Sequence, residues 1–352
     1  MNTESVDGAW LALDIGGANL KGAHSGGEAR SLPFEVWKRP GELAQGLGML
    51  LATLPPAGSV ALTTTAELCD CYPTKAFGVA AVLDAALEAI GPRPVAVWGI
   101  DGRFHSVGAI RDRPALAAAA NWLALATLAC RLIPDGPGIL IDVGSTTTDL
   151  IPLQHGRVAV QGRTDTDRLR TGELVYAGVR RTPLCSLARE LPFRGEPTGL
   201  TAELFATTLD VYLTLGEIAV DPDELSTADG RPATSDAALD RLARMVGTDR
   251  DEFTRADADG LARDADAALT DRLVDAAERV GRATVGRPSS AVVAGSGEFL
   301  ARRVADRVLG PGGRIVSLGS AWGPAASSAA CALALVRLAA EWAEAGGLES
   351  LG

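Results

Sequence analysis

The sequence predicts an α/β protein with two similar domains that face each other across a cleft. Two segments, LALDIGGANLKG (residues 11–22) and ILIDVGSTTTDL (residues 139–150), are imperfect copies of one pattern. Each copy has an apolar run, an Asp, a β-branched residue, a Gly, small polar residues and a second apolar stretch, which indicates a strand, a tight turn and a strand. The length of 352 residues suits two domains better than a single core.

The first third of the chain alternates expected strands and helices. Its expected strands are residues 10–15, 20–24, 60–64 and 95–99, and its expected helices are residues 42–54 and 75–90. The second of these helices has a run of Ala, Val and Leu that stops at Gly91 and Pro92. This alternation is typical of an α/β layer fold.

The rest of the chain repeats the plan with an addition. A long Ala-rich helix over residues 114–133 is broken at Pro134, and the second copy of the pattern follows. Further helical spacing covers residues 201–215, 235–246, 257–285 and 323–344, with an apolar strand at residues 290–294. We therefore expect one domain over residues 1–133 and a second over residues 134–352, with a helical insertion around residues 200–287.

Composition excludes several classes of function. The net charge is −11 and no block of Lys and Arg occurs, so nucleic acid is not an expected partner. The five Cys and three scattered His indicate reduced thiols and no zinc site. The chain starts with polar and acidic residues and has no apolar run of the roughly 18 residues that a membrane span needs. We expect a cytoplasmic protein that does not bind membranes.

The turn of the first copy has the composition of a phosphate-binding loop. Gly16 and Gly17 lack a Cβ where the backbone turns, so amide groups can approach phosphate oxygens. Asp14 ends the strand and suits Mg²⁺, which keeps waters beside one or two carboxylates. Asn19 and Lys21 would add polar contacts, Lys21 as a point charge. Taken alone, the segment favours a glycine turn that binds nothing.

Two later segments supply groups of the same kind. Asp142 takes the place of Asp14 in the second copy, followed by Gly144, Ser145, Thr146 and Thr147. The strand at 290–294 leads into Gly295, Ser296, Gly297 and Glu298. A nucleoside or its phosphates can lie against the backbone of such a strand–turn–helix unit. A Thr-rich strand and an ordinary turn are the alternatives for each segment alone, but all three together favour one ligand site.

In this order, the three segments resemble those of the actin/sugar-kinase/Hsp70 superfamily, whose domains are ribonuclease H-like. The resemblance implies a first phosphate loop at residues 14–21, a second at residues 142–149 and an adenosine-type loop at residues 295–298. It also implies two connecting helices beside the cleft, at residues 115–133 and 324–345. Nearly the whole chain is covered by this resemblance.

Four further segments resemble the hydantoinase/oxoprolinase-like proteins, in the branch linked to tetrahydromethanopterin one-carbon transfer. They are TTTAELCD (residues 63–70), WGIDG (98–102), AANW (119–122) and GELVYAGVRRTP (172–183). Members of this branch act in methanofuran biosynthesis, where an aminomethylfuran methyl diphosphate is joined to the phenol of γ-glutamyltyramine and pyrophosphate leaves. The resemblance therefore implies a transferase that takes a diphosphate ester and a phenolic amine.

This resemblance implies catalytic roles for acidic residues. Asp14 and Asp142 would hold Mg²⁺, and donors in the two turns would stabilise the departing pyrophosphate. A base would activate the phenol, whose ordinary pKa is about 10. Glu67, Asp70 and Asp101 are the candidates for this base, and the sequence does not rank them. Glu67 and Asp70 are equally consistent with a helix N-terminal turn, where carboxylates offset the helix dipole.

Other polar residues in these segments are expected to contact the substrates. Asp101, Arg180 and Arg181 are the candidates, and the two arginines would clamp the diphosphate or the γ-glutamyl carboxylate. Pairing with surface carboxylates is the alternative role for both arginines. Cys69 and Cys71 are expected to be buried small residues rather than nucleophiles.

Two other functions stay open at the level of the sequence. The three loops do not separate a diphosphate ester from a nucleotide, so an ATP-dependent small-molecule kinase or ATP hydrolase, with ATP or ADP in the cleft, is one alternative. A non-enzymatic nucleotide-binding sensor or scaffold, as among actin-like assembly proteins, is the other. The oligomeric state is also open, with a homodimer as one option.

Overall fold

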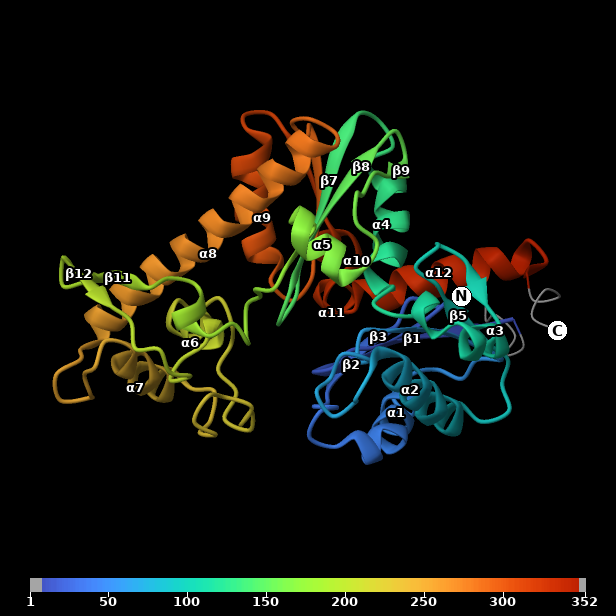
Figure 1. Ribbon diagram of the computed structural model, residues 1–352, viewed down its shortest axis with the longest axis horizontal. Coiled ribbons are helices and arrows are strands. Elements are labelled where there is room, and N and C mark those ends of the chain that lie inside the picture. Colours follow the sequence, from blue (N-terminus) through green and yellow to red (C-terminus); the bar gives the residue numbers. More distant parts are fainter. Residues whose placement is uncertain (1–7, 348–352) are drawn as a thin grey trace.

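Two α/β halves, each built on a mixed sheet, make up the structure, a computed structural model that describes residues 8–347 (Figure 1). The polar start of the chain, which entered the expectation of a cytoplasmic protein, lies almost entirely outside the described residues. Within residues 8–347, no helix has both the length and the apolar composition needed to cross a bilayer.

The first sheet has six strands, with the strand that precedes the first turn at its centre. Their order is β3 (Ala29–Pro33), β2 (Asn19–His24), β1 (Trp10–Ile15), β4 (Ser59–Thr64), β5 (Val95–Trp98) and β6 (Phe104–His105). Strands β1, β2 and β3 form an antiparallel meander, whereas β4 and β5 run parallel to β1. Every residue of β1 is buried, as its nearly continuous apolar run predicts for a central strand.

The second sheet repeats this topology. Its order is β10 (Leu174–Val175), β8 (Thr148–Gln154), β7 (Pro137–Val143), β13 (Ser290–Ala294) and β14 (Arg314–Ser317), with β9 (Arg157–Val158) also paired to β8. Strands β7, β8 and β9 form the meander, while β13 and β14 run parallel to β7. The repeated sequence pattern therefore corresponds to a repeated arrangement of strands.

The remaining elements cover the sheets and connect them. The helices are α1 (Leu43–Leu51), α2 (Lys75–Ile90), α3 (Val107–Asp112), α4 (Asn121–Leu132), α5 (Asp165–Thr171), α6 (Thr208–Thr214), α7 (Ser235–Met245), α8 (Arg255–Ala283), α9 (Glu298–Leu309), α10 (Leu318–Trp322), α11 (Pro324–Ser328) and α12 (Ala330–Glu344). Short 3₁₀ helices are η1 (Pro40–Glu42), η2 (Pro114–Leu116) and η3 (Leu184–Ser186), and a separate ribbon is formed by β11 (Glu190–Phe193) and β12 (Glu196–Gly199).

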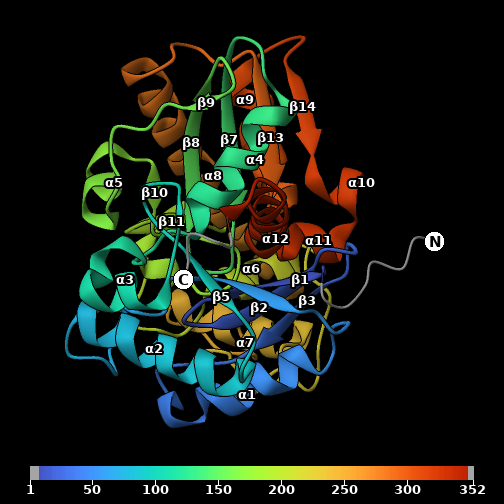
Figure 2. The same ribbon diagram turned by 90° about the vertical axis from the view of Figure 1, so that its right-hand side faces the viewer.

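The alternation of side chains along the strands creates three cores. One face of the first sheet packs on α1 and α2, and the outer face of the second sheet packs on α8 and α9. The two inner faces share a core with α4 and α12, which lie between the sheets. Figure 2 views α12 nearly end-on in this position. The small residues of α4 and α12 allow them to approach closely, and Arg131 and Glu341 join them by hydrogen bonds of 2.5 and 2.7 Å.

Both connecting helices are shorter than the sequence predicts. The expected helix at 115–133 begins only at Asn121, because Ala118 bridges to Thr64 and Ala119 has a φ of 48°, which an α-helix does not accommodate. The expected helix at 324–345 is divided at Ala329 into α11 and α12. Each interruption lies at the end of the helix that faces the two turns.

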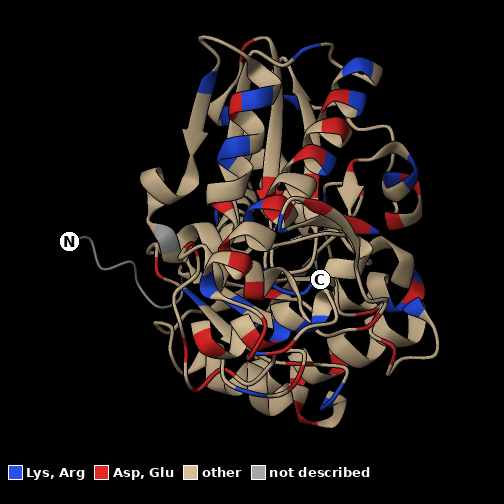
Figure 3. Ribbon diagram, turned by 90° about the vertical axis from the view of Figure 1, so that its left-hand side faces the viewer, with Lys and Arg blue, Asp and Glu red and all other residues tan. Residues whose placement is uncertain are grey.

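The helical insertion extends away from the second sheet, at the left of Figure 1. It contains α6, α7, one end of α8 and the β11–β12 ribbon. Arg241 is only 1% exposed and pairs with Asp210 at 2.7 Å and Asp229 at 2.9 Å. Figure 3 views this side and shows acidic and basic positions interspersed, without a separate basic face. This arrangement agrees with solvated, ion-paired helices.

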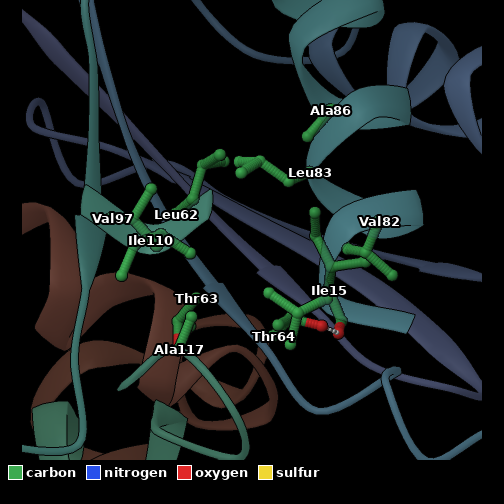
Figure 4. Close-up of a pocket in the computed structure, with 11 residues that line it drawn as sticks. Ile15, Leu62, Thr63, Thr64, Val82, Leu83, Ala86, Val97, Ile110 and Ala117 are labelled. Carbon is green, nitrogen blue, oxygen red and sulfur yellow. Dashed lines mark hydrogen bonds between the residues drawn. The ribbon is translucent and has the colours of Figure 1, made fainter. Parts of the chain in front are cut away.

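A small cavity lies inside the first half, between β4 and α2 (Figure 4). Its volume is about 20 Å³, and it is lined mainly by aliphatic side chains such as Leu62, Leu83 and Ile110. The Thr64 hydroxyl is turned away to the Ile15 carbonyl oxygen, at 3.1 Å. The cavity is a packing gap with room for about one water molecule, which is too small for a phosphate ligand.

Candidate functional site

The two copies of the sequence pattern form equivalent β-hairpins. Gly16 N donates to Asn19 O at 3.1 Å, and Gly144 N donates to Thr147 O at 2.8 Å. The strands of the first hairpin place Asp14 opposite Lys21. In the second hairpin the same position holds Asp142 opposite Asp149. The alignment made from the sequence is therefore confirmed, and it extends to a pair of residues that differ in charge.

The two turns meet between the halves. Asn19 Nδ2 donates to Ser145 Oγ at 3.4 Å, so side chains that are 126 positions apart in sequence join the two turns. Gly17, Thr146 and Thr147 are only partly exposed at the same junction. A Cβ at Gly17 would lie 2.9 Å from Cys69 Sγ, so close packing against Cys69 favours glycine at this position.

A cluster of charges lies beneath the turns. Burial raises the pKa of Asp14 above its ordinary value, although Lys21 opposes part of the shift. Burial and the nearby Asp149 raise the pKa of Asp142 to about 7. Burial lowers the pKa of Lys21, but the surrounding carboxylates, led by Asp14, outweigh it and leave that pKa raised. Three carboxylates thus surround one ammonium group, and negative charge is in excess.

Both connecting helices contribute to this cluster. Asn121, the first residue of α4, donates from Nδ2 to Asp14 Oδ1 at 3.3 Å. Cys331, in the first turn of α12, lies with Sγ 3.9 Å from Asp142 Oδ2. Burial raises the pKa of the Cys331 thiol well above its ordinary value, so this group stays a neutral donor. The interrupted ends of the helices therefore deliver polar groups to the cluster.

The chemistry of the donors fits Mg²⁺. The carboxylates of Asp14 and Asp142 and the hydroxyls of the second turn are the oxygen ligands that this ion prefers, whereas the Asn121 amide oxygen accepts from Trp122 N at 2.7 Å. Burial and, after it, the neighbouring carboxylates raise the pKa of Asp142, and a bound cation would relieve the part that comes from those carboxylates. Among the described residues, no three His, Cys, Asp or Glu side chains converge closely enough to hold an ion alone. Waters and ligand phosphates would complete its coordination.

The third predicted loop packs against the second hairpin. Gly295 has a φ of 96°, and a Cβ there would lie 2.5 Å from Asp142 Oδ1. Gly297 N donates to Val143 O at 2.8 Å, and Ser296 is exposed. Glu298 turns elsewhere, since it accepts hydrogen bonds from Gly319 N at 2.8 Å and from the hydroxyls of Ser317 and Ser327. Its carboxylate joins α9 to α10 and α11 rather than facing the turns.

Glu67 is distinguished among the candidate bases. It is 1% exposed, and among the described residues neither of its carboxylate oxygens has a well-aligned hydrogen-bond partner. Burial, with a smaller contribution from Asp165, raises the pKa of Glu67 to about 7, although the nearby backbone amides of Glu67 and Ala119 oppose part of the shift. Its segment wraps around the first turn, because Thr65 N donates to Ile15 O at 3.0 Å. An unpaired buried carboxylate is costly, which is typical of functional groups.

The other two candidate bases have ordinary environments. Asp70 is exposed on the same segment. Partial burial opposes ionisation of Asp101, but the hydrogen bond with His105, at 2.9 Å, leaves the pKa of Asp101 below its ordinary value. Burial and hydrogen bonding thus single out Glu67 among the three carboxylates, which the sequence alone did not rank.

The two arginines after β10 differ in their contacts. Arg180 lies with Nη1 3.7 Å from Glu224 Oε2 in the insertion. The guanidinium of Arg181 lies over the ring of Trp37, 4.2 Å from its centroid. Trp37 belongs to the first half and Arg181 to the second, so this contact crosses between them.

Several residues of the site were not predicted. Asp149 ends the second predicted loop, at the position that Lys21 occupies in the first, but it was assigned no role. Arg168, only 1% exposed, pairs with Asp149 at 2.5 Å and lies over the ring of Trp122, 4.1 Å from the centroid. It also approaches Asp165 at 3.9 Å. No local sequence signal marks Arg168, because its partners come from separate elements.

Comparisons with known proteins agree with this architecture. The hydantoinase/oxoprolinase family matches residues 59–340. A Methanocaldococcus jannaschii protein named (4-{4-[2-(gamma-L-glutamylamino)ethyl]phenoxymethyl}furan-2-yl)methanamine synthase is 37% identical over 244 residues, which cover 68% of this chain and 72% of that protein. A protein of the same name from Methanococcus vannielii is 34% identical over 142 residues, covering 40% of this chain and 64% of the relative.

A solved structure shows the same fold at low identity. In the PilM–PilN type IV pilus biogenesis complex, the matched chain is 15% identical, with a TM-score of 0.51, and the match covers 94% of this chain and 98% of that one. The repeated sheet topology and the helices between the sheets are features of the actin/Hsp70/sugar-kinase fold that the sequence predicted. The chain has this fold and belongs to the hydantoinase/oxoprolinase family.

Proposed function

We propose that this protein is a transferase of methanofuran-type cofactor biosynthesis. It joins an aminomethylfuran methyl diphosphate to the phenol of γ-glutamyltyramine, or a similar acceptor, and releases pyrophosphate. The observation that carries the proposal is the 37% identity to the Methanocaldococcus jannaschii synthase over 68% of the chain. The fold alone does not select this activity, because proteins of one fold serve many functions.

The two turns suit the leaving group. As the furanylmethyl carbon–oxygen bond breaks, its electron pair goes to the pyrophosphate, where charge develops. The N–H groups of Gly16 and Gly144 close the turns themselves, so the backbone donors of Gly17, Ser145 and Thr146 and the ammonium of Lys21 would act where that charge appears. A bound Mg²⁺ at Asp14 and Asp142 would supply Lewis-acid stabilisation of the same charge.

Glu67 suits the acceptor. A new bond forms between the phenol oxygen and the furanylmethyl carbon, and the phenol proton passes to Glu67. The pKa of about 7 for Glu67 makes it a stronger base than an ordinary carboxylate. The phenol pKa is about 10, so proton transfer before bond formation is unfavourable. We expect the proton to move as the carbon–oxygen bond forms.

The direct test is a reconstituted reaction. Purified protein, Mg²⁺, the diphosphate ester and γ-glutamyltyramine should give stoichiometric pyrophosphate and an ether product of the expected mass. Omission of the acceptor is the control for hydrolysis of the ester. Failure to form the ether from these substrates, with a protein that is folded, would refute the assignment.

Nucleotide binding separates this proposal from its alternatives. Titration calorimetry with pyrophosphate, ADP and ATP in Mg²⁺ should show that pyrophosphate binds and that ATP is not turned over. ATP hydrolysis that increases with a small acceptor would favour a kinase instead. Nucleotide binding without any turnover would favour a sensor or scaffold.

A further inference from the structure

A contact between the halves lies beside the two turns. Arg181, which follows β10, places its guanidinium carbon 4.2 Å from the centre of the Trp37 ring, which follows β3. Trp37 is partly buried, whereas Arg181 is exposed. A cation held over an indole face is attracted by the negative electrostatic potential of the ring. The contact therefore fixes an exposed cation at the junction of the two halves.

Each partner lies on a segment that is layered on one turn. In the first half, Val36 N donates to Gly17 O at 2.9 Å, which places Trp37 directly beside the first turn. In the second half, Arg181 N donates to Ser145 O at 3.0 Å. Arg181 and Val36, the residue before Trp37, are thus hydrogen-bonded to the two proposed phosphate turns. The side chains of Trp37 and Arg181 can therefore touch only when these two turns lie close together.

The guanidinium of Arg181 has unused donors. Within residues 8–347 its side chain makes no hydrogen bond or ion pair, unlike Arg180, which has Glu224 at 3.7 Å. Stacking uses only the face of a guanidinium, so the N–H groups in its plane stay available to an anion. Guanidinium groups bind phosphate and carboxylate oxygens in a bidentate manner, which an ammonium group does not.

The charges under the turns favour additional positive charge beside them. Across the two hairpins Asp14 lies opposite Lys21 and Asp142 lies opposite Asp149, so carboxylates outnumber ammonium groups beneath the turns and an anionic ligand gains from additional positive charge. Arg168 is already paired with Asp149 at 2.5 Å. Arg181 lies beside the second turn, and within the described part of the chain no carboxylate forms an ion pair with it.

We propose that Trp37 is a positioning residue that holds Arg181 beside the two turns, where the free N–H groups of Arg181 bind an anionic oxygen of the ligand. The proposal rests on the proposed function in one respect, since it takes a diphosphate as that anion. The proposal adds Trp37 to the residues of the site. It also requires that the first half, through Trp37, and the second half, through Arg181, together form one contact with the anion. Loss of Trp37 therefore weakens binding by releasing Arg181, not by removing a group that touches the ligand.

The test is calorimetric titration of pyrophosphate in Mg²⁺ with four variants. Arg181→Gln should weaken binding, and Trp37→Leu should weaken it about threefold to thirtyfold, the range expected for a cation–π contact. Trp37→Phe keeps an aromatic face and should stay within about twofold of wild type. The double variant Trp37→Leu/Arg181→Gln should bind no more weakly than Arg181→Gln alone, because Trp37 acts through Arg181.

The matched control is Arg39→Gln. Arg39 makes a similar contact, 4.7 Å from the Phe34 ring centre, but both residues belong to the first half. Its loss should leave pyrophosphate binding unchanged. Wild-type affinity in Trp37→Leu, equal weakening by Phe and Leu at position 37, or additive losses in the double variant would each overturn the positioning role.

The same titrations distinguish failure of the proposed function from failure of the role proposed for Trp37. If the wild type binds ATP but not pyrophosphate, the transferase assignment fails, and the same variants titrated with ATP then decide the role of Trp37 by the same criteria. If neither anion binds a folded wild-type protein, both proposals are overturned. Thermal unfolding of every variant establishes that the protein titrated is folded.

Discussion

Replacement of Glu67 by Gln tests the catalytic assignment most directly. Gln has nearly the same shape but cannot accept the phenol proton. General-base catalysis contributes typically about 10² to 10⁴ in rate. We therefore expect Glu67→Gln to lower kcat by about that factor, while KM for the diphosphate ester changes little because the turns are untouched.

The pH profile provides a second measure of the same group. The base must be ionised, so wild-type kcat/KM should rise with pH and level off above the pKa of about 7 that burial gives Glu67. One pH unit below that pKa, about a tenth of the base is ionised, and the rate should be about tenfold lower. This limb should be absent from the residual activity of the Gln variant.

Stability should change in the opposite direction to activity. The folded pKa of Glu67, about 7, lies above the ordinary value of 4.5, so protonation favours the folded state. The associated stability is present below pH 4.5 and is lost as pH rises through about 7, at a cost of about 3 kcal/mol. The unpaired amide of Gln costs about 1–3 kcal/mol instead. Unfolding free energy in the alkaline range should therefore be unchanged or higher in Glu67→Gln.

The assay measures pyrophosphate release at saturating and limiting ester across the pH range, with urea unfolding in the same buffers. Asp70→Asn is the matched control, because Asp70 is three positions away on the same segment and is exposed. This variant should retain the wild-type kcat and the same rise of kcat/KM with pH as the wild type. More than a tenth of wild-type activity in Glu67→Gln, with the limb unchanged, would refute Glu67 as the base and leave the phenol to another group.

Three other predictions concern the charged cluster and the first turn. Asp142→Asn should abolish Mg²⁺-dependent activity without loss of thermal stability, since burial and Asp149 already disfavour its charge; full activity would remove Asp142 from the metal site. Gly17→Val should weaken pyrophosphate binding in calorimetry, because a Cβ there meets Cys69 Sγ at 2.9 Å, and unchanged affinity would make the turn purely structural. Arg168→Leu should lower the free energy of unfolding by about 3–5 kcal/mol, as loss of one partner strands a buried charge; a change below about 1 kcal/mol in urea unfolding would show that Asp149 is satisfied without it.

The fold was predictable because its information is local and repeated. The apolar run of β1 and the glycine turn after it specify a hairpin, and the second copy specifies another. The start of α4 was not predictable, because the Ala-rich sequence before Asn121 has high helix propensity. Its path is set instead by the bridge between Thr64 and Ala118, which is a tertiary contact.

The site was predictable where the two copies coincide and not where separate elements meet. Asp14 and Asp142 follow from the pattern itself. Glu67 could be named as a candidate, but its rank depends on burial and on the lack, among the described residues, of a well-aligned hydrogen-bond partner, and both arise only when the segment wraps around the first turn. Trp37 and Arg181 carry no motif in common, so their contact is visible only when the two halves are placed together.

One difference between the copies accounts for much of the asymmetry of the site. In the first hairpin Lys21 faces Asp14, whereas in the second Asp149 faces Asp142, and like charges directly opposite are destabilising. The second hairpin therefore requires an external cation, and Arg168 supplies it from α5. Because α5 also carries Asp165, the same helix brings a negative charge toward Glu67 and helps to raise its pKa. A single change of charge within a duplicated hairpin thus links the proposed leaving-group side of the site to the proposed base.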